Sequence, residues 1–392
     1  MAAVPMSAGH MLALIRSGQA RTRRELQSVT GLARTTVLQR LDLLLEAGWV
    51  RERGVTTSTG GRPPTRLEFD EGHAVVLAAD LETTHARAAV LDLAGRPLAE
   101  HTGALAVSDG PVAVLDTLAK WFGMLVERAG RPMGDVCGAG LSVPGPVEFE
   151  TGRVVRPPIM AGWDGYDIAA HLRGELGAPG LPVLVDNDAN MMALGEHAAG
   201  YPESPAFVLV KVSTGIGAGV IVDGRVYRGI DGGAGDIGHV RISGADDALC
   251  QCGSYGCLAA VASGRAIARA LTGMGLPTSS GSGVRERLQA DQPEAVRLAR
   301  EAGQRVGEVL ATVVSLLNPE VLMVTGDLAG TPFVAGVREL LYQRALPRIT
   351  RNLRVVTGEL GDRAGLCGIG HLVVEHLYAP AQVDARLEEG AA

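Results

Sequence analysis

The strongest constraint on the fold is an apolar strand pattern that occurs twice in the chain. The stretch "HAVVLAADLETTHARAAVLDLAGRPLAE", which begins at His73, holds two apolar strand patterns, and the second ends at a glycine turn. A similar core recurs in "PAFVLVKVSTGIGAGVIVDGRVYRG", which begins at Pro205. Helical stretches follow each of them. The recurrence therefore predicts a duplicated α/β fold with a cleft between two lobes.

Polar loops follow apolar strands at three further places in the body: "VCGAGLSVPGPVE", "LPVLVDNDANMMALGEHAAG" and "NPEVLMVTGDLAG". Loops of this form deliver side chains to a cleft. At 392 residues the chain is long enough for two or three domains. We place the first lobe at residues 73–190, closed by a helix at 364–378, and the second lobe at 191–363. Residues 379–392 are expected to form a flexible tail.

The first 72 residues differ from this body in both charge and pattern. Residues 1–68 carry ten arginines and five acidic residues, a net charge of +5, whereas the whole chain carries −7. Such a basic segment favours an anionic partner. Three helical patterns follow one another in "MLALIRSG", "TRRELQSVTG" and "LARTTVLQRLDLLLEAG". Two short helices joined by a glycine turn are typical of a helix-turn-helix, whose second helix enters the major groove of DNA.

A strand, a polar tip and a returning strand are predicted next, in "WVRERGVTTSTGGRPPTRLEF". This pattern is typical of the wing of a winged helix-turn-helix. Arginine and glutamine read base edges through paired hydrogen bonds, and threonine suits phosphates and thymine methyl groups. The residues expected to contact DNA are Arg23, Arg34, Thr35, Thr36, Gln39, Arg40 and, in the wing, Arg62. The alternatives are a small three-helix interaction domain and a plain linker.

Three of the five cysteines lie within eight residues, in "CQCGSYGC". Cys250, Cys252 and Cys257 offer three thiolates, and His239 lies eleven residues upstream. Three sulfur ligands and one imidazole suit tetrahedral Zn²⁺, and four protein ligands leave no open position, so a structural zinc ion is predicted. The alternative is a reduced cluster without metal. The cysteine spacing does not resemble a secreted disulfide framework, and neither a signal peptide nor a membrane span is expected, which favours a cytoplasmic protein.

The combination of motifs resembles a known family. The stretch "VSTGIGAGVIVDGRVYRGIDGGAGDIGH", followed by "CQCGSYGC", is similar to the signature of the ROK family (repressors, open reading frames and kinases). "VDNDAN" and "SVPGPV" match further segments of that family. The resemblance runs from about residue 73 to 378. It implies an actin-like, ribonuclease-H-like two-lobed α/β body, and the head fits the family's repressor branch.

The resemblance also assigns sugar-site positions. Asp188 matches the catalytic base of the family kinases and Asn187 a ligand of a sugar hydroxyl; a loop-capping or purely sugar-binding role for Asp188 is the alternative. The family's Glu-x-x-His motif reads Asp236-Ile237-Gly238-His239 here, and a family glutamate two residues after the last zinc cysteine is Ala259. The ligand-binding positions are Asn187, Asp188, Asp236, His239 and Gly145.

The phosphate-binding loops depart further from the family pattern. Kinases of the family carry Asp-x-Gly-Gly-Thr, whereas this chain has Asp80-Leu81-Glu82-Thr83-Thr84, which places a negative charge where a polyphosphate would bind. The second loop, "STGIGAG", is intact, and its alternative role is a tight hairpin that the fold requires. The expected remnants of the nucleotide loops are Asp80, Thr84, Thr214, Gly215, Gly217 and Gly326.

These observations predict a DNA-binding transcriptional regulator, a repressor of the ROK type, whose body senses a sugar or a sugar derivative. Operator DNA and this effector are the expected partners, and two-fold half-sites imply a homodimer or homotetramer. An active ATP-dependent sugar kinase with an accessory DNA-binding head is the alternative. A third possibility is a DNA-binding protein with a vestigial sugar pocket.

Overall fold

The head is a small domain at one end of the molecule. The computed structural model describes residues 6–54, 65–279 and 281–390. In the head it contains α1 (Ala8–Arg16), α2 (Arg23–Thr30), α3 (Arg34–Glu46) and the antiparallel pair β1 (Val50–Arg53) and β2 (Arg66–Phe69). The tip of the predicted wing, with Arg62, lies outside the described residues.

Local sequence explains the boundaries of the predicted helix-turn-helix. The hydroxyl of Thr22 accepts a hydrogen bond from the Glu25 amide at 3.2 Å, which caps the start of α2. Gly31 ends that helix at a φ of +69°, a left-handed conformation that glycine adopts without steric cost. The chain therefore changes direction at Gly31 before α3 begins at Arg34.

The first lobe is built on a five-stranded sheet in the order β5-β4-β3-β6-β9. Its strands are β3 (Val75–Leu81), β4 (His85–Asp92), β5 (Pro97–Ala104), β6 (Val136–Val143) and β9 (Val183–Asn187). Alternate residues of β3 face two different cores. One core includes α4 (Pro111–Arg128) and α5 (Ile168–Glu175), and the other includes α6 (Asp188–Gly200) and α13 (Ala364–Leu377).

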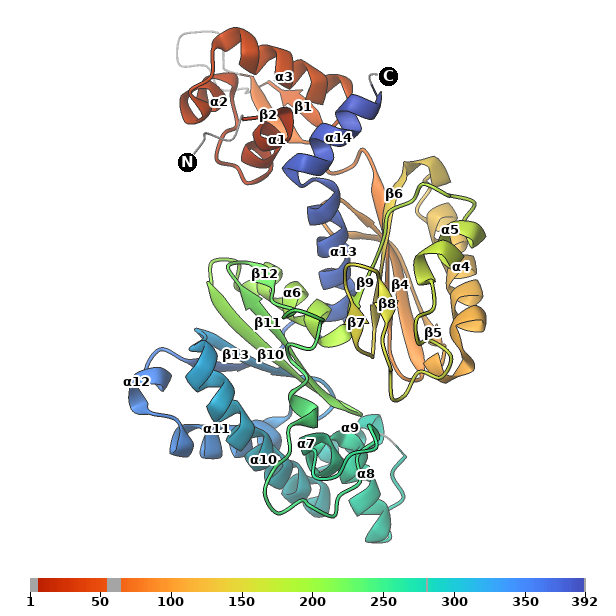
Figure 1. Ribbon diagram of the computed structural model, residues 1–392, viewed down its shortest axis with the longest axis vertical. Helices are drawn as coiled ribbons and strands as arrows, with labels where there is room; N and C mark the ends of the chain where they lie inside the picture. The colour runs from red at the N-terminus through yellow and green to blue at the C-terminus, as the bar shows by residue number, and fades with distance from the viewer. Residues whose placement is uncertain (1–5, 55–64, 280, 391–392) are drawn as a thin grey trace.

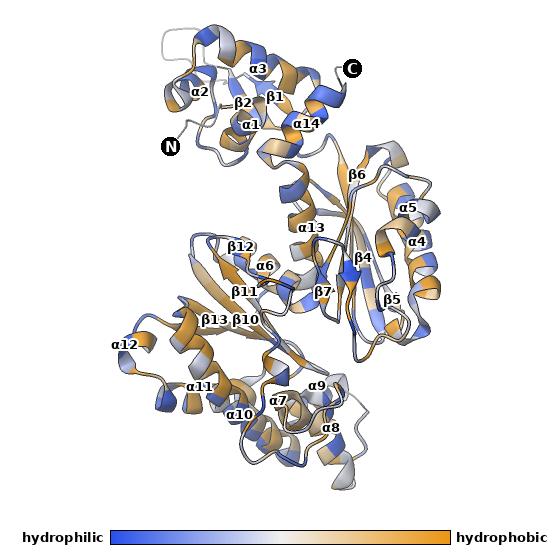
Figure 2. Cartoon of the chain, viewed as in Figure 1, coloured by the Kyte–Doolittle hydropathy of each residue, from blue (hydrophilic) through white to orange (hydrophobic). Residues whose placement is uncertain are grey.

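The second lobe repeats this topology with a sheet in the order β12-β11-β10-β13-β14. Its strands are β10 (Ala206–Val212), β11 (Ile216–Val222), β12 (Arg225–Val226), β13 (Val321–Thr325) and β14 (Arg354–Thr357). In both sheets the first three strands are antiparallel and the last two join them in parallel. The predicted duplication is confirmed, and apolar residues concentrate in the strands and on the helix faces that cover them (Figure 2).

Helices cover the outer face of the second sheet. Short strands and single turns of 3-10 helix lie between the main elements of both lobes. The helices are α7 (Leu258–Ala262), α8 (Gly264–Gly273), α9 (Gly281–Gln289), α10 (Pro293–Leu317), α11 (Thr331–Arg344) and α12 (Pro347–Thr350). The shorter elements are β7 (Val147–Glu148), β8 (Arg153–Val154), η1 (Val107–Asp109), η2 (Met133–Asp135), η3 (Ile237–His239) and η4 (Gly361–Arg363). No helix in the described part of the chain is both long and apolar enough to cross a membrane.

Two helices hold the lobes and the head together. Helix α6 packs against both sheets, and α13 packs against α6 so closely that a Cβ on Gly368 would lie 1.8 Å from the Met191 carbonyl oxygen. After α13 the chain enters α14 (Pro380–Gly390), which lies against α1 of the head (Figure 1).

The prediction of a flexible tail over residues 379–392 is therefore wrong for residues 380–390. The side chain of Val383 is fully buried, Leu387 packs on the same core, and the Gly9 amide donates to Asp384 Oδ1 at 2.8 Å. These contacts compensate for the entropy of ordering the segment. The segment is polar for most of its length because only one of its faces meets the head.

Candidate functional site

A cleft between the lobes consists of two adjoining cavities. The smaller has a volume of about 210 Å³ and the larger about 1020 Å³. Residues from both lobes line both cavities, namely Glu82, Thr83, Lys211, Ser213, Thr214, Arg265 and Asp327. The predicted sugar-site residues line the smaller cavity: Gly145, Asn187, Asp188, Asp236 and His239. The structure thus brings the predicted sugar-site residues together in one cavity.

Asn187 and Asp188 stand where β9 ends and α6 begins. Asn187 caps the helix, since its side-chain oxygen accepts a hydrogen bond from the Ala189 amide at 2.9 Å, and its Nδ2 donates to the Gly145 carbonyl at 3.0 Å. Asp188 Oδ1 accepts from the same Ala189 amide at 2.7 Å. Its other oxygen, Oδ2, lies 2.7 Å from Lys211 Nζ. The carboxylate at the family base position is therefore held by a cation of the chain itself.

Lys211 lies at the centre of the acidic residues of the cleft, and the sequence reasoning missed it. Burial opposes its charge, but the carboxylates of Asp188, Glu82 and Asp80 outweigh that effect and raise the pKa of Lys211. The signal in the sequence was a lone lysine in the apolar run "VLVKV". A buried lysine in a strand requires a charged partner, although the sequence does not say which one.

Asp80 and Glu82 differ in ionisation although they are two residues apart. Burial raises the pKa of Asp80 to about 7 against the pull of Lys211, and its Oδ1 atom has no hydrogen-bond partner among the described residues. Burial also acts on Glu82, but the hydrogen bond from His85 at 3.2 Å and the charge of Lys211 outweigh it and hold its pKa at about 2. Glu82 is therefore ionised at neutral pH, whereas Asp80 titrates near it.

The Asp80→Asn variant is expected to become more stable relative to the parent protein as the pH rises from about 5 to 8. A folded-state pKa above the unfolded value means that the stabilisation is complete in acid and is lost as the pH rises through about 7. Between pH 5 and the folded-state pKa of about 7 the difference amounts to about 3 kcal/mol, at about 1.4 kcal/mol per pH unit. Urea unfolding of both proteins at pH 5 and pH 8 measures it, and a pH-independent difference contradicts the assignment.

The predicted remnants of the nucleotide loops surround the larger cavity. Asp80, Thr84, Thr214 and Gly326 line it, whereas Gly215 and Gly217 line the smaller one. Gly326 has a φ of +101°, and a Cβ there would lie 2.6 Å from Ser213 Oγ. The turn after β13 therefore requires glycine both for its backbone conformation and for close packing. The glycine at this turn therefore does not by itself indicate nucleotide binding.

One wall of the smaller cavity belongs to the predicted metal site. The ligand atoms of His239, Cys250, Cys252 and Cys257 all lie within 4.8 Å of one another. His239 Nδ1 is 3.7 Å from Cys250 Sγ, and Cys252 Sγ is 3.8 Å from Cys257 Sγ. Four soft ligands at this spacing fit one tetrahedral metal ion. Ala259 lines the same cavity just after the cluster.

Two further polar groups line the cavity near this wall. Burial raises the pKa of Asp236, which precedes η3. Asn190, which the sequence reasoning did not single out, is 3% exposed, and its Oδ1 has no hydrogen-bond partner among the residues that the structure describes. An unpaired buried acceptor beside a cavity is satisfied by a ligand or by water.

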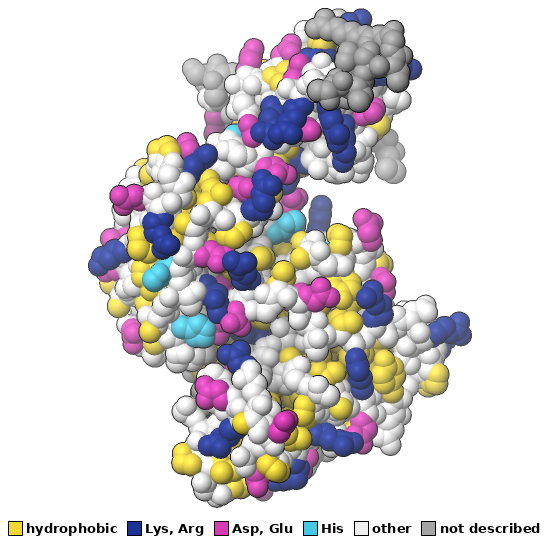
Figure 3. Space-filling model, turned by 180° about the vertical axis from the view of Figure 1, so that it is seen from behind, with side chains coloured by type: hydrophobic (Ala, Val, Ile, Leu, Met, Phe, Trp, Pro, Cys, Tyr) yellow, Lys and Arg dark blue, Asp and Glu magenta, His cyan; other side chains and the backbone are white. Residues whose placement is uncertain are grey.

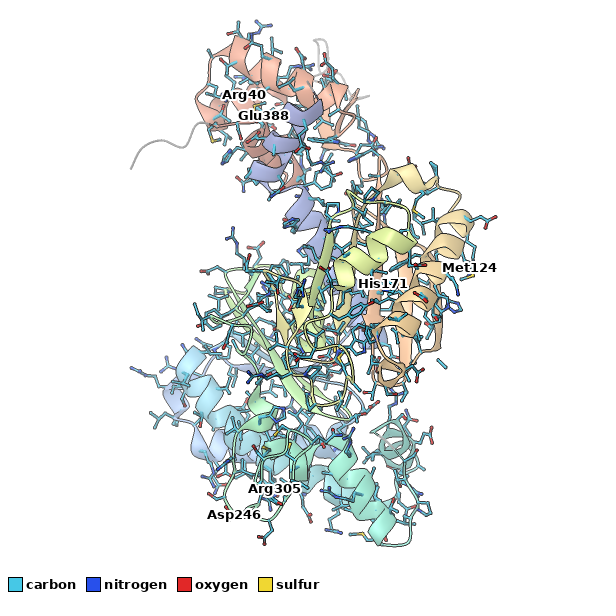
Figure 4. All side chains as sticks on the ribbon, turned by 45° about the vertical axis from the view of Figure 1, so that its right-hand side comes forward. Arg40, Met124, His171, Asp246, Arg305 and Glu388 are labelled. Carbon is cyan, nitrogen blue, oxygen red and sulfur yellow. The ribbon has the colours of Figure 1, made fainter. Side chains whose placement is uncertain are left out.

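Some of the predicted DNA-binding side chains are exposed to solvent, and others bond to groups of the head itself. Arg34, Thr35 and Gln39 are exposed at the start and along the outer side of α3, and Thr36 is half-buried. Arg40 (Figure 4) instead donates to the Met6 carbonyl, and Arg23 of α2 pairs with Glu52. Several basic side chains, all of them arginines because the head contains no lysine, lie on the face of the head shown in Figure 3. The freest part of the predicted interface is therefore the first half of α3.

Comparison with known proteins gives the family. The ROK family model matches residues 76–376. A xylose repressor of Caldicellulosiruptor bescii is 28% identical over 91% of this chain and 92% of its own length. A glucokinase of Halalkalibacterium halodurans is 30% identical over 68% of this chain and 84% of its own. The crystal structure of a ROK transcriptional regulator, a homologue of the E. coli Mlc protein, matches with a TM-score of 0.81, at 25% identity, over 97% of this chain and 98% of its own. The match to this regulator includes the head, and the chain belongs to the ROK family.

Proposed function

We propose that this chain is a transcriptional repressor that binds operator DNA through its head and releases it when a sugar or sugar derivative enters the cleft. The observation that carries the proposal is the exposed polar face of α3, the helix that follows the turn at Gly31. This face carries Arg34, Thr35 and Gln39. This face suits the major groove, where arginine and glutamine pair with base edges. Arg62 in the wing would contact the minor groove.

Pairing of chains follows from the same geometry. A single helix reads a short stretch of DNA, and two-fold operators are bound by two heads one or more helical turns apart. We therefore propose a homodimer or homotetramer as the active form. Operator binding and unoxidised thiolates both fit a cytoplasmic protein.

We further propose that His239, Cys250, Cys252 and Cys257 hold a structural Zn²⁺. A zinc ion bound by four protein ligands supplies folding energy and no open coordination position for catalysis. His239 and Cys250 both line the smaller cavity, so the metal would fix that wall of the effector site.

Phosphotransfer is not part of the proposed function. The Lys211 ammonium holds Asp188 at 2.7 Å, and such a carboxylate is a poorer base towards a sugar hydroxyl. The ionised Glu82 faces both cavities, where it would repel a polyphosphate. The alternative of an active sugar kinase is supported by the presence of Asn187 and Asp188 in the cavity. A coupled assay with ATP and a broad sugar panel tests it, and turnover at the 1 to 10³ s⁻¹ typical of enzymes overturns the proposal on this point.

A conformational change in the cleft is expected to reach the head through helices α6, α13 and α14. Asp188 begins α6, α6 packs on α13, and α13 continues into α14 on the head. An effector that binds one arrangement of the lobes more tightly than the other shifts the population of chains whose heads match the operator.

Selection of bound genomic DNA fragments by the full chain, with and without candidate sugars, tests the proposal. We expect salt-sensitive enrichment of a two-fold sequence that one class of sugar reduces. On the selected operator, Arg34→Ala and Gln39→Ala are each expected to cost about 1–3 kcal/mol of binding free energy and to relax discrimination. Arg128→Ala removes an exposed arginine at the end of α4 and is the matched control. Equal binding by all three variants contradicts the assignment of α3.

A further inference from the structure

Helix α8 places two arginines on the wall of the effector cavity. Arg265 and Arg269 both line the smaller cavity, and Arg265 also lines the larger one. Arg269 donates to the Ala260 carbonyl at 2.9 Å. Within the described ranges of the chain, neither guanidinium lies within 4.0 Å of a carboxylate, and the side chain of Arg265 makes no hydrogen bond. Arg265 is half-buried, so its charge lacks full hydration and, among the described residues, a carboxylate partner.

The acidic residues of the same cavity are, in contrast, mostly paired. Three of its four carboxylates have basic partners, in the pairs Asp188–Lys211 (2.7 Å), Glu82–His85 (3.2 Å) and Asp327–Arg285 (3.5 Å). The fourth, Asp236, has no ion pair with any residue that the structure describes. The charges left for a ligand are therefore two arginines on α8 and one carboxylate before η3.

The remaining polar groups of the cavity suit hydroxyl groups. Asn190 Oδ1 is a buried acceptor with no hydrogen-bond partner among the described residues, and the Asp236 carboxylate is a second acceptor for which the described part of the chain offers no ion pair. A volume of about 210 Å³ is below the roughly 300–1,000 Å³ of pockets for drug-sized ligands, so it suits a molecule of about one sugar ring. Ala259 stands at the position where family members carry a glutamate. The smaller cavity therefore lacks that negative charge, while Arg265 contributes a positive one.

We propose that the ligand of the smaller cavity is a polyhydroxy compound of one sugar ring that carries an anionic group, a phosphate or a carboxylate, and that Arg265 binds this group. The inference rests on the proposed function, because it names the chemical class of the effector. Arginine suits both anions, since its planar guanidinium donates two parallel hydrogen bonds.

Two other roles for Arg265 give different results. It interacts electrostatically with Cys250, so it could serve as a counter-ion of the metal cluster, in which case its removal lowers the zinc content. It also lines the larger cavity, so it could bind a triphosphate, in which case AMP-PNP binds without any sugar and binding depends on Arg265.

Calorimetry on the full-length, zinc-loaded protein separates these roles. Three related compounds are titrated, glucose, glucose 6-phosphate and glucuronate, which share one sugar ring and differ in the group at C6. Xylose and xylose 5-phosphate follow as a second set. We expect an anionic member to bind at least about tenfold more tightly than its neutral parent. Arg265→Ala is expected to abolish that preference and to leave the neutral sugar's affinity within about twofold, whereas Arg265→Lys restores part of the preference. Comparing the affinities of the phosphorylated and the carboxylated compound within one set identifies which anion the site binds.

Arg348→Ala is the matched control, because it removes an exposed arginine of α12 in the same lobe. Zinc content and thermal unfolding of each variant are measured together with binding. Equal affinity for neutral and anionic members overturns the inference and leaves the proposed function intact. Zinc loss in Arg265→Ala, or Arg265-dependent binding of AMP-PNP, assigns the arginine to one of the other roles and also overturns it. If no member of either set binds or changes operator affinity, sugar sensing itself fails.

Discussion

A chain that ends at Tyr378 is expected to lose operator binding although both lobes of its body fold. The deletion removes α14, whose Val383 is fully buried and whose Leu387 packs on the core shared with α1. Fully burying one such side chain contributes about 1.5–3 kcal/mol. The Arg386 guanidinium, 4.6 Å from the centroid of the Trp49 ring, is lost as well. A head of about 70 residues has too small a core to tolerate that loss.

Fluorescence anisotropy on the selected operator and thermal unfolding by circular dichroism measure this effect. We expect operator affinity to fall by at least about a hundredfold, as about 3 kcal/mol of lost packing implies. Effector binding by the truncated chain shows that the body has folded. A truncated chain that binds the operator within about twofold of the full chain contradicts the proposed role of α14.

A single substitution tests the same contact without deleting any chain. Gly9 lies in α1, and a Cβ at this position would be 2.1 Å from the carbonyl oxygen of Pro380 at the start of α14. Gly9→Ala is therefore expected to lower the unfolding free energy of the head by about 1–3 kcal/mol, because backbone must move. Gly123→Ala in α4 is the control, since nothing lies within 4 Å of its Cβ position. There the better helix propensity of alanine stabilises by about 0.5–1 kcal/mol. Stabilisation by both variants would contradict tight docking of α14.

Most of the fold could be predicted because its signals are local. The repeated strand pattern fixed the duplicated sheets, and the Thr22 cap and the Gly31 turn fixed the head helices. The docking of α14 could not be predicted in this way. Its only large apolar side chains are Val383 and Leu387, and their partners in α1 lie at the other end of the sequence. A pattern that short gives no indication of a partner so distant in sequence.

The residues of the candidate site likewise differ in how far the sequence could predict them. Asn187 and Asp188 and the zinc ligands stand in short motifs, so sequence alone brought them together. Lys211 and Arg265 belong to no such motif. Lys211 meets Asp188 because β10 packs against α6, and Arg265 lines the cavity from the first turn of α8. Their roles depend on sheet order and helix packing, which a single sequence does not contain.

Replacing Cys257 by serine is expected to remove the metal and the effector affinity but to leave operator binding in place. Cys257 is 1% exposed, and it precedes α7, whose residue Ala259 lines the effector cavity. A structural zinc site contributes on the order of 10 kcal/mol to folding, so three remaining ligands are not expected to keep this loop ordered. The head should be unaffected, because α7 lies in the second lobe at the end of the molecule far from α1 (Figure 1).

Elemental analysis, calorimetry and operator anisotropy on one preparation separate the three effects. The parent protein should contain about one zinc ion per chain, as one Cys3His set implies, and Cys257→Ser close to none. Cys367→Ser is the control, because this cysteine lies in α13, outside the ligand set, and its zinc content should match the parent. Full zinc content in Cys257→Ser, or effector binding at the parent's affinity without zinc, contradicts a metal-braced cavity wall. Loss of operator binding together with zinc would mean that the metal site influences the head, because the described residues of the head and α14 lie at the opposite end of the molecule from this loop.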